Sequence, residues 1–595
     1  MQNISRLVYP FSRKKATADL AGPARWSPGR LGSTPASTRM GKRLCAQNRP
    51  AERLFPPSPP VPGKFSPGSE YTFPKGGALL KLDRTSILYG TMLLTATGLL
   101  NQVLGFFYRI LLSRLVGAEI MGLYQLVMPV YSVLLSVTAV GLTAAVSNLT
   151  SEYRALGNWA AAGQVLRRCL VLLVALLVLP ALVVVLFSDP ISVYLLGDAR
   201  TQLGLLLLLP CILLTGVENL HKHAFYGAGM IRPPAFTELL EQVVRTCAVL
   251  GLLVAFLPQN PERTVGLIVT GMVLCEVFSA CTLTLLHRRY RRGLSGPRGP
   301  GVPPRELDRR IARIALPIAA TSLLGNLMGS VCAILIPQKL VAGGMEVSAA
   351  VSAFGVMFGM SIPMLNLPTA FIAALGLVLV PKLAESTALG RRAEVRRRVS
   401  KAMLGTSVLM LPAMAFLVVL GPTLGEALFR EPTVGDYLTP LSIGVVLSCY
   451  QSVLSCSLNG VGRQPAAARN ALICGAVELV IVFFTVGIPG VGLQGYVLAA
   501  LISSLLGVVL GAVGLYRAVG LRPELFRWLT APGLSALLMG LNINLLFQVL
   551  QNRGLSPLWS AAACLALGSV LYLAALSAQG VWVGELFRLR RREER

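Results

Sequence analysis

The chain has 595 residues, of which 54% are hydrophobic and only 13% charged, and its mean hydropathy is +0.66. Soluble globular chains carry about a quarter charged residues, so the composition indicates a multi-pass protein of the cytoplasmic membrane. It excludes disordered and collagen-like proteins, and despite the net charge of +28 no nucleic-acid partner is expected. The eleven cysteines lie mostly in apolar runs and form no CxxC pair, so neither a disulfide framework nor a metal site is indicated.

The segment 1–84 differs from the rest of the chain. It holds fifteen Lys or Arg and four Asp or Glu, and it is rich in Pro, Ser and Gly. Such a basic segment buries too little apolar surface to fold, and no signal-peptide apolar stretch precedes Ile87. Two interpretations remain: a disordered cytoplasmic tail that touches anionic lipid headgroups, or translated upstream sequence from a mis-assigned start. We favour the second.

From Ile87 onward, about fourteen apolar stretches are each long enough to cross a bilayer. They lack the two-residue alternation of barrel strands, so they are predicted to be transmembrane helices. The fold class is therefore an all-α membrane protein. The predicted spans are 86–108, 120–147, 169–188, 202–220, 237–258, 264–286, 314–337, 349–380, 402–420, 439–458, 470–487, 495–516, 530–549 and 558–578.

Positive charge orients this array of helices. With the N-terminus inside, the segments on the inner side after the leader carry 31 Lys or Arg, and those on the outer side carry 7. Cytoplasmic loops carry the excess of positive charge, so both termini are predicted to be cytoplasmic (N-in/C-in). The arginine clusters at 288–292 and 396–398 are interpreted as part of this insertion signal rather than as specific lipid sites.

An internal repeat divides the membrane part. A shift of 224 positions aligns the first span with the seventh, and a shift of 233 aligns the ends of the fourth and tenth spans. Parallel repeats of this kind place a substrate site between two lobes, which give alternating access by rocking. The predicted organisation is an N-terminal six-helix lobe (85–292), a cytoplasmic linker (293–313), a C-terminal six-helix lobe (314–516), and a final helix pair with a basic cytoplasmic tail (517–595).

Polar and small residues form one stripe on the first span. Gly98, Asn101, Gln102, Gly105 and Arg109 lie three or four residues apart or side by side, so they share a helix face. The seventh span has a similar stripe that includes an asparagine, Asn326. Two interpretations stay open and are compatible on one helix: close helix packing through small residues, or the polar lining of a cavity.

Four basic residues are candidates for a phosphate-binding cavity between the lobes, namely Arg109, Arg114, Arg245 and Lys339. Arginine suits the paired recognition of phosphate oxygens, and a dry cavity strengthens that attraction. Each of two residues has a second interpretation. Arg109 falls where the first span reaches the outer boundary, and Arg245 has a local ion-pair partner in Glu241, one helical turn earlier.

Three carboxylates that lie within predicted spans are candidates for ion coupling, namely Glu218, Glu276 and Glu478. A carrier driven by protons or sodium needs a carboxylate within the membrane. The chain has no Walker phosphate loop, GxSxG elbow or HExxH motif. We therefore expect neither an enzyme nor a cofactor nor transport driven by ATP on this chain. The expected energy source is the membrane potential, a proton gradient or a sodium gradient.

Two motifs carry a family resemblance. The first is Val103-Leu104-Gly105-Phe106 with Arg109, Ser113-Arg114-Leu115-Val116-Gly117 and Gly122-Leu123-Tyr124. The second runs from Pro363-Met364-Leu365-Asn366-Leu367-Pro368 to Val380-Pro381-Lys382-Leu383. They resemble the stage V sporulation protein B and polysaccharide biosynthesis (lipid II flippase-like) family of the multidrug/oligosaccharidyl-lipid/polysaccharide exporter superfamily. Chains of this family begin near the position of Lys81, which is why the leader is suspected not to be native.

The resemblance implies a flippase that moves a polyprenyl-pyrophosphate-linked sugar to the outer leaflet, with lipid II for peptidoglycan or spore cortex as the cargo. The implied partners are a lipid-linked oligosaccharide, membrane lipids and cell-wall synthesis enzymes, and Asn366 joins Asn101, Gln102 and Asn326 as expected cavity lining. Family members often carry an arginine where this chain has Gln102, so Arg109 is the better-supported phosphate contact. The alternatives are a cation-coupled multidrug extruder of the same fold and a non-transporting scaffold for cell-wall synthesis.

Overall fold

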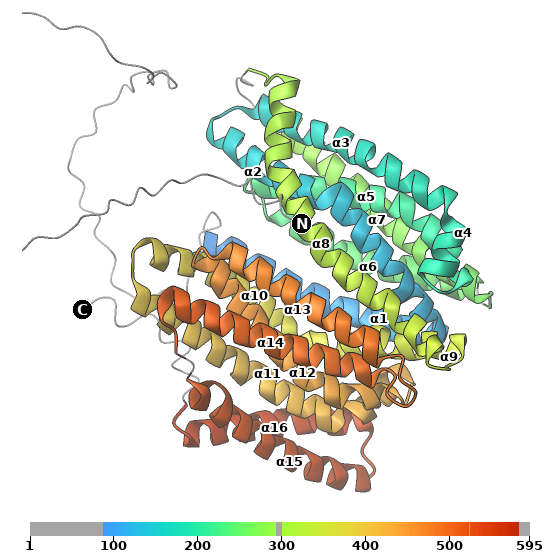
Figure 1. Ribbon diagram of the computed structural model, residues 1–595, viewed down its shortest axis with the longest axis vertical. Helices are drawn as coiled ribbons and strands as arrows, with labels where there is room; N and C mark the ends of the chain where they lie inside the picture. The colour runs from blue at the N-terminus through green and yellow to red at the C-terminus, as the bar shows by residue number, and fades with distance from the viewer. Residues whose placement is uncertain (1–86, 257, 293–299, 523, 582–595) are drawn as a thin grey trace, which may run out of the picture. The chain divides into compact units, whose positions relative to one another are not determined.

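The computed structural model describes residues 87–581 except 257, 293–299 and 523, and within these ranges it holds helices and no strand. The predicted all-helical fold is confirmed. The described residues group into one compact unit (Figure 1). The leader predicted at 1–84 and most of the basic tail, from residue 582 on, lie outside the described residues.

The first half of the chain forms helices that pack mainly on one another. In lipid every backbone polar group must be satisfied within the protein, which helices achieve. The helices are α1 (Ile87–Leu135), η1 (Ser136–Val140), α2 (Gly141–Ala155), α3 (Trp159–Leu186), α4 (Ser188–Pro190), η2 (Ile191–Leu195), η3 (Ala199–Thr201), α5 (Gln202–Gly227), α6 (Arg232–Phe256) and α7 (Pro261–Arg292).

The second half follows with a similar succession and ends in a separate helix pair. Its helices are α8 (Pro304–Ala342), α9 (Val347–Phe354), η4 (Gly355–Ser361), α10 (Ile362–Ala388), α11 (Arg392–Phe429), α12 (Val434–Gly460), α13 (Gln464–Thr485), α14 (Gln494–Val519), η5 (Phe526–Thr530), α15 (Ala531–Asn552) and α16 (Pro557–Ala578). The last two pack against α11 and against each other.

Thirteen helices of the described part are long and apolar enough to cross a bilayer. The longest, Met92–Ala155, has 64 residues, about three times what a hydrocarbon core of ~30 Å requires. It changes direction at Gly117, whose φ of 77° and ψ of 178° suit glycine alone. This kink separates the first two predicted spans, so the thirteen helices account for all fourteen predicted stretches.

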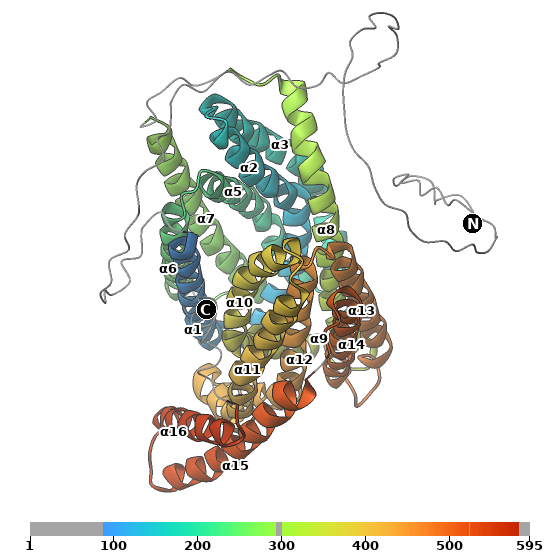
Figure 2. The same ribbon diagram turned by 90° about the vertical axis from the view of Figure 1, so that its left-hand side faces the viewer.

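The helices gather into two groups, one formed by α2 to α7 and the other by α10 to α14 (Figure 2). Helix α8 contacts both. Its Asn326 donates to Ser136 Oγ at 2.6 Å and its Ser330 to the Pro129 carbonyl at 3.0 Å, while other residues of α8 pack on α13. The boundaries predicted for the two lobes, their internal repeat and the N-in/C-in orientation stay predictions.

The second part of the predicted linker is helical, because α8 begins at Pro304 rather than near residue 314. Proline is favourable at the first helical position, where its missing N–H costs nothing. Leu307 and Ile311 of this extension are buried against the first helix group. On its polar side Asp308 pairs with Arg168 at 2.6 Å. Helical periodicity therefore continues into a stretch that composition alone marks as hydrophilic. Residues 293–299 of the linker are outside the described ranges.

Two glycines bring the middle of α1 close to α9 and η4. A Cβ added to Gly122 would lie 2.0 Å from the Val351 carbonyl oxygen, and one added to Gly355 would lie 2.1 Å from the Ala118 carbonyl oxygen. No side chain fits at either position. Small residues let helix backbones approach this closely, so the contact depends on both glycines.

We predict that Gly355→Ala destabilises the protein by about 1–3 kcal/mol, the usual cost of overpacking a close contact. The thermal unfolding midpoint of the detergent-solubilised protein measures this. Gly251→Ala in α6 is the matched control, since a Cβ there meets no atom within 4 Å. Equal midpoints for the two variants would show that this close approach is not a fixed contact.

Candidate substrate cavity and buried charge network

A cavity of about 350 Å³ lies between α6 of the first group and α10 of the second, with α1 and η4 completing its wall. Helix α1 contributes the polar stripe predicted from its spacing. The sequence-predicted residues that line the cavity are Asn101, Gln102, Arg109, Arg245 and Asn366. Asn101 of this stripe also donates to Glu238 Oε1 of α6 at 3.4 Å. Close packing through the small residues of the stripe stays a prediction, since a Cβ added to Gly98 would meet no atom within 4 Å.

The cavity is basic and partly aromatic. Arg109 and Arg245 supply its charge, and no carboxylate belongs to its lining within the described part of the chain. Arg109 forms no ion pair with any described residue. Phenylalanine and tyrosine side chains complete the wall, among them Tyr108, Tyr124 and Phe358. A positive, low-dielectric space of this kind attracts an anion strongly.

Arg245 has two partners behind the cavity wall. Its Nη2 lies 2.7 Å from Glu241 Oε1 on its own helix and 3.2 Å from Glu276 Oε1 on α7. The two interpretations of Arg245, a structural ion pair and a cavity cation, are thus both realised in one side chain. The arginine joins the cavity to a second set of charges.

That set is a buried charge network between α5, α6 and α7, which we define as Glu218, Lys222, Glu241, Arg245 and Glu276. Lys222 Nζ lies 2.5 Å from Glu218 Oε1 and 3.2 Å from Glu241 Oε2. The three carboxylates come within 4.8 Å of one another. With every member ionised, three negative charges face two positive ones, so the network has one carboxylate in excess.

Two buried carboxylate oxygens of the network have no hydrogen-bond partner among the described residues, and one of them, Glu218 Oε1, lies 2.5 Å from the Lys222 ammonium. Glu276 is 2% exposed, and its Oε2 has no hydrogen-bond partner among the described residues. A buried carboxylate oxygen without a partner is costly unless it takes up a proton or a cation. The sequence pointed to Glu218 and Glu276 but missed Lys222. The signal was available, because Glu218–Lys222 and Glu241–Arg245 are both pairs four residues apart.

Three sequence-predicted cavity residues lie elsewhere. Arg114 donates to the carbonyls of Ala427 and Leu428, both at 2.6 Å, at the end of α11. Lys339 sits 3.6 Å above the ring of Phe483, and Asn326 bonds to α1–η1 as described above. The four expected cations are therefore not brought together: Arg109 and Arg245 share the cavity, and Arg114 and Lys339 do not line it. Their contribution to substrate binding stays a prediction.

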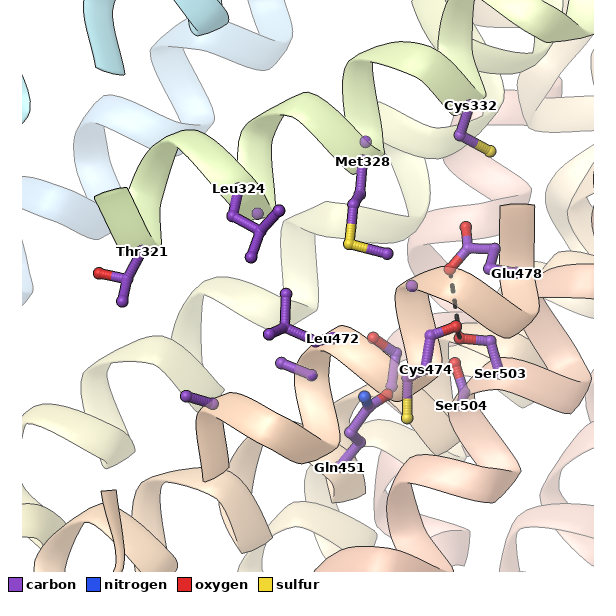
Figure 3. Close-up of a pocket in the computed structure, with 16 residues that line it drawn as sticks. Thr321, Leu324, Met328, Cys332, Gln451, Leu472, Cys474, Glu478, Ser503 and Ser504 are labelled. Carbon is purple, nitrogen blue, oxygen red and sulfur yellow. Dashed lines mark hydrogen bonds between the residues drawn. The ribbon is translucent and has the colours of Figure 1, made fainter. Parts of the chain in front are cut away.

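Glu478 belongs to a second cavity, of about 420 Å³, within the C-terminal group between α8, α12, α13 and α14. Figure 3 shows its carboxylate beside Ser503, whose hydroxyl donates to Glu478 Oε2 at 3.2 Å. Thr321, Met328 and Gln451 line other parts of the same space. Glu478 and the buried charge network thus occupy different helix groups.

The comparison with known proteins identifies the family. Residues 87–386 match the family described as polysaccharide biosynthesis protein. The chain belongs to this family. One relative of this chain, stage V sporulation protein B of Bacillus subtilis (strain 168), is 24% identical to it over 436 residues, which cover 72% of this chain and 84% of the relative. Lipid II flippase MurJ of the same strain is 22% identical over 467 residues, covering 73% and 84%.

Solved structures of other proteins share the fold of this chain. Lipid II flippase MurJ in an inward closed conformation has a TM-score of 0.60 and 14% identity, covering 84% of this chain and all of that one. An inward-facing multidrug resistance MATE family transporter of the MOP superfamily has a TM-score of 0.55 and 17% identity, covering 72% and 98%. The chain is thus a multi-pass protein of the cell membrane with the superfamily fold.

We predict that Lys222→Met lowers the free energy of unfolding by about 3–5 kcal/mol, because it leaves buried carboxylates without their cation. Thermal unfolding at neutral pH measures the change. Adding Glu218→Gln to Lys222→Met restores the charge balance of the network and should recover part of the loss. A Lys222→Met protein as stable as the wild type would show that these charges are not coupled.

Proposed function

We propose that the protein is a flippase that moves a polyprenyl-pyrophosphate-linked sugar, with lipid II as the leading candidate, across the cytoplasmic membrane by alternating access. Family membership supports a polysaccharide-related transport role, and the relatives include a protein named lipid II flippase and one named for sporulation. The observation that carries the proposal is the basic cavity between the two helix groups, lined by Arg109 and Arg245.

The chemistry of the cavity fits the polar end of such a carrier. A pyrophosphate presents several anionic oxygens, which guanidinium groups bind in pairs. Asn101, Gln102 and Asn366 offer amide donors and acceptors for sugar hydroxyls, and the aromatic side chains offer flat apolar surface to sugar rings. The polyprenyl tail then stays between lipid-facing helices, because burying it in a basic cavity gains nothing over leaving it in the bilayer.

The shared arginine gives a route from cargo binding to ion binding. An anion in the cavity competes with Glu241 and Glu276 for Arg245, which lies 2.7 and 3.2 Å from them. When Arg245 turns to the anion, a further carboxylate of the network loses its compensating cation, and uptake of a proton or a sodium ion restores the balance. Arg245 is in this account the coupling residue, and Glu276 the acceptor of the cation.

The cation-coupled drug extruder is the alternative within the same fold. Extruded drugs are commonly cationic, and they favour an acidic cavity. The cavity lining bears two arginines and, among the described residues, no carboxylate, which favours an anionic cargo. A non-transporting scaffold has no need of a basic cavity inside the membrane, where ionised groups are costly.

We predict that the wild-type chain restores outer-leaflet exposure of lipid II in cells depleted of their own flippase, and that Arg109→Ala reduces the restored exposure at least about tenfold, since it removes charge-assisted hydrogen bonds. Arg109→Lys keeps the charge but not the paired geometry and should lie between them. Arg553 is an exposed arginine between α15 and α16, and Arg553→Ala is the control for the amount of protein in the membrane. Wild-type exposure by Arg109→Ala at equal protein level would contradict the assignment of Arg109.

We predict that binding of a short-chain polyprenyl pyrophosphate to the purified protein is accompanied by uptake of up to one proton or sodium ion. A pH indicator in weak buffer and a sodium-tracer assay measure the uptake. Glu276→Gln should reduce the uptake at least about fivefold, because it removes the acceptor, while Glu478→Gln should leave it unchanged. The reverse pattern would move ion coupling to the cavity of the C-terminal group and overturn the role of Arg245.

A further inference from the structure

We propose that a second basic site, at the predicted inner ends of α11 and α14, binds the phosphate group of an anionic glycerophospholipid. The site is a pocket of about 740 Å³, which we call the headgroup pocket. It lies outside the candidate cargo cavity and shares no lining residue with it. The inference does not depend on the identity of the cargo. It departs from the sequence-based interpretation of the 396–398 cluster as an insertion signal alone, because the fold adds cations from a different segment to it.

The charge of the pocket comes from two separate segments. Arg396, Arg397 and Lys401 of α11 all line the pocket, and Arg397 and Lys401, four positions apart, share a helix face. The chain between α14 and α15 contributes Arg522 and Arg527. Glu524 is the one carboxylate of the lining. Five cations against one anion leave the pocket strongly positive, which is the expected signature of phosphate binding between helices at an inner membrane surface.

Local ion pairs do not account for two of these cations, Arg396 and Arg397. The neighbouring Arg398 pairs with Glu394 and donates to the Lys382 carbonyl, as a solvated helix surface would have it. Arg396 instead donates to the Val519 carbonyl at 3.3 Å, at the end of α14. Within the described ranges neither Arg396 nor Arg397 forms an ion pair. The charges of Arg396 and Arg397, unlike that of Arg398, are therefore available to an anion.

The wall of the pocket is built rather than incidental. Trp528 is 5% exposed, and its indole Nε1 donates to Ser400 Oγ at 2.9 Å. Ser400 in turn donates to Glu524 Oε2 at 3.3 Å. These bonds fasten η5 to the first turns of α11, so the cations of the two segments are held around one space.

The neighbouring surface selects a lipid over a free phosphate. Leu525, Phe526 and Leu529 flank the basic residues of η5 and are 64%, 64% and 47% exposed. Leu537 continues this exposed apolar surface on α15. Apolar side chains beside cations are the pattern of a segment at the headgroup and acyl-chain boundary. A phosphate with acyl chains satisfies both surfaces, whereas a soluble phosphate leaves the apolar one in water.

The test is to measure lipid binding to the purified full-length protein by native mass spectrometry. Phosphatidylglycerol should bind at least about tenfold more tightly than phosphatidylcholine. The double variant Arg396→Gln with Arg397→Gln should weaken phosphatidylglycerol binding at least about tenfold, since each basic residue near an anionic lipid adds substantially to binding. Arg288→Gln with Arg289→Gln, on the exposed end of α7, removes the same charge elsewhere and should leave the preference intact.

Each other outcome overturns the proposal. Equal binding of the two lipids, or equal losses in the two double variants, would reduce the pocket to a general effect of net charge. Displacement of phosphatidylglycerol by millimolar inorganic phosphate would assign the pocket to a soluble anion. If the double variant of α11 fails to fold, Arg522→Gln in the chain between α14 and α15 serves instead, with an expected loss of several-fold, and wild-type affinity in that variant contradicts the site.

Discussion

Charged side chains inside a bilayer have no water to solvate them, and this constraint shapes the functional part of the molecule. The five residues of the buried charge network come from three helices, and they contact one another because each charge is too costly to bury alone. Their mutual contacts fix how α5, α6 and α7 pack. They also hold Arg245 at the wall of the cavity, where its charge is available to a cargo.

The same constraint makes the network responsive. Three carboxylates and two cations cannot all be compensated, and the unpartnered oxygen of Glu276 marks where the balance fails. An anion that attracts Arg245 changes that balance without contacting a carboxylate. Cargo recognition and cation uptake are in this account two consequences of one shared side chain. In the proposed headgroup pocket at the membrane surface, an anionic lipid would compensate the clustered cations in the same way.

Much of the fold could be predicted from the sequence, because hydropathy and span length depend on local composition. The polar stripe of α1 could also be predicted from the sequence, since helical spacing alone places Asn101, Gln102 and Arg109 on one face. Contacts that depend on tertiary packing were not. Arg114 caps the end of α11, 314 positions away from its acceptor at Leu428, and Lys339 stacks on Phe483. Nothing local distinguishes either residue from Arg109. The pairing of Lys222 with Glu241 likewise requires that α5 and α6 be placed side by side.

The most direct test of the central claim is transport by the purified protein alone. Vesicles that contain the chain and a fluorescent polyprenyl-pyrophosphate-linked sugar allow the fraction of carrier in the outer leaflet to be followed with a membrane-impermeant quencher. The account predicts that the carrier crosses faster than in protein-free vesicles, and that an imposed proton or sodium gradient changes the rate. A rate equal to that of protein-free vesicles, with correctly folded protein present, would contradict it.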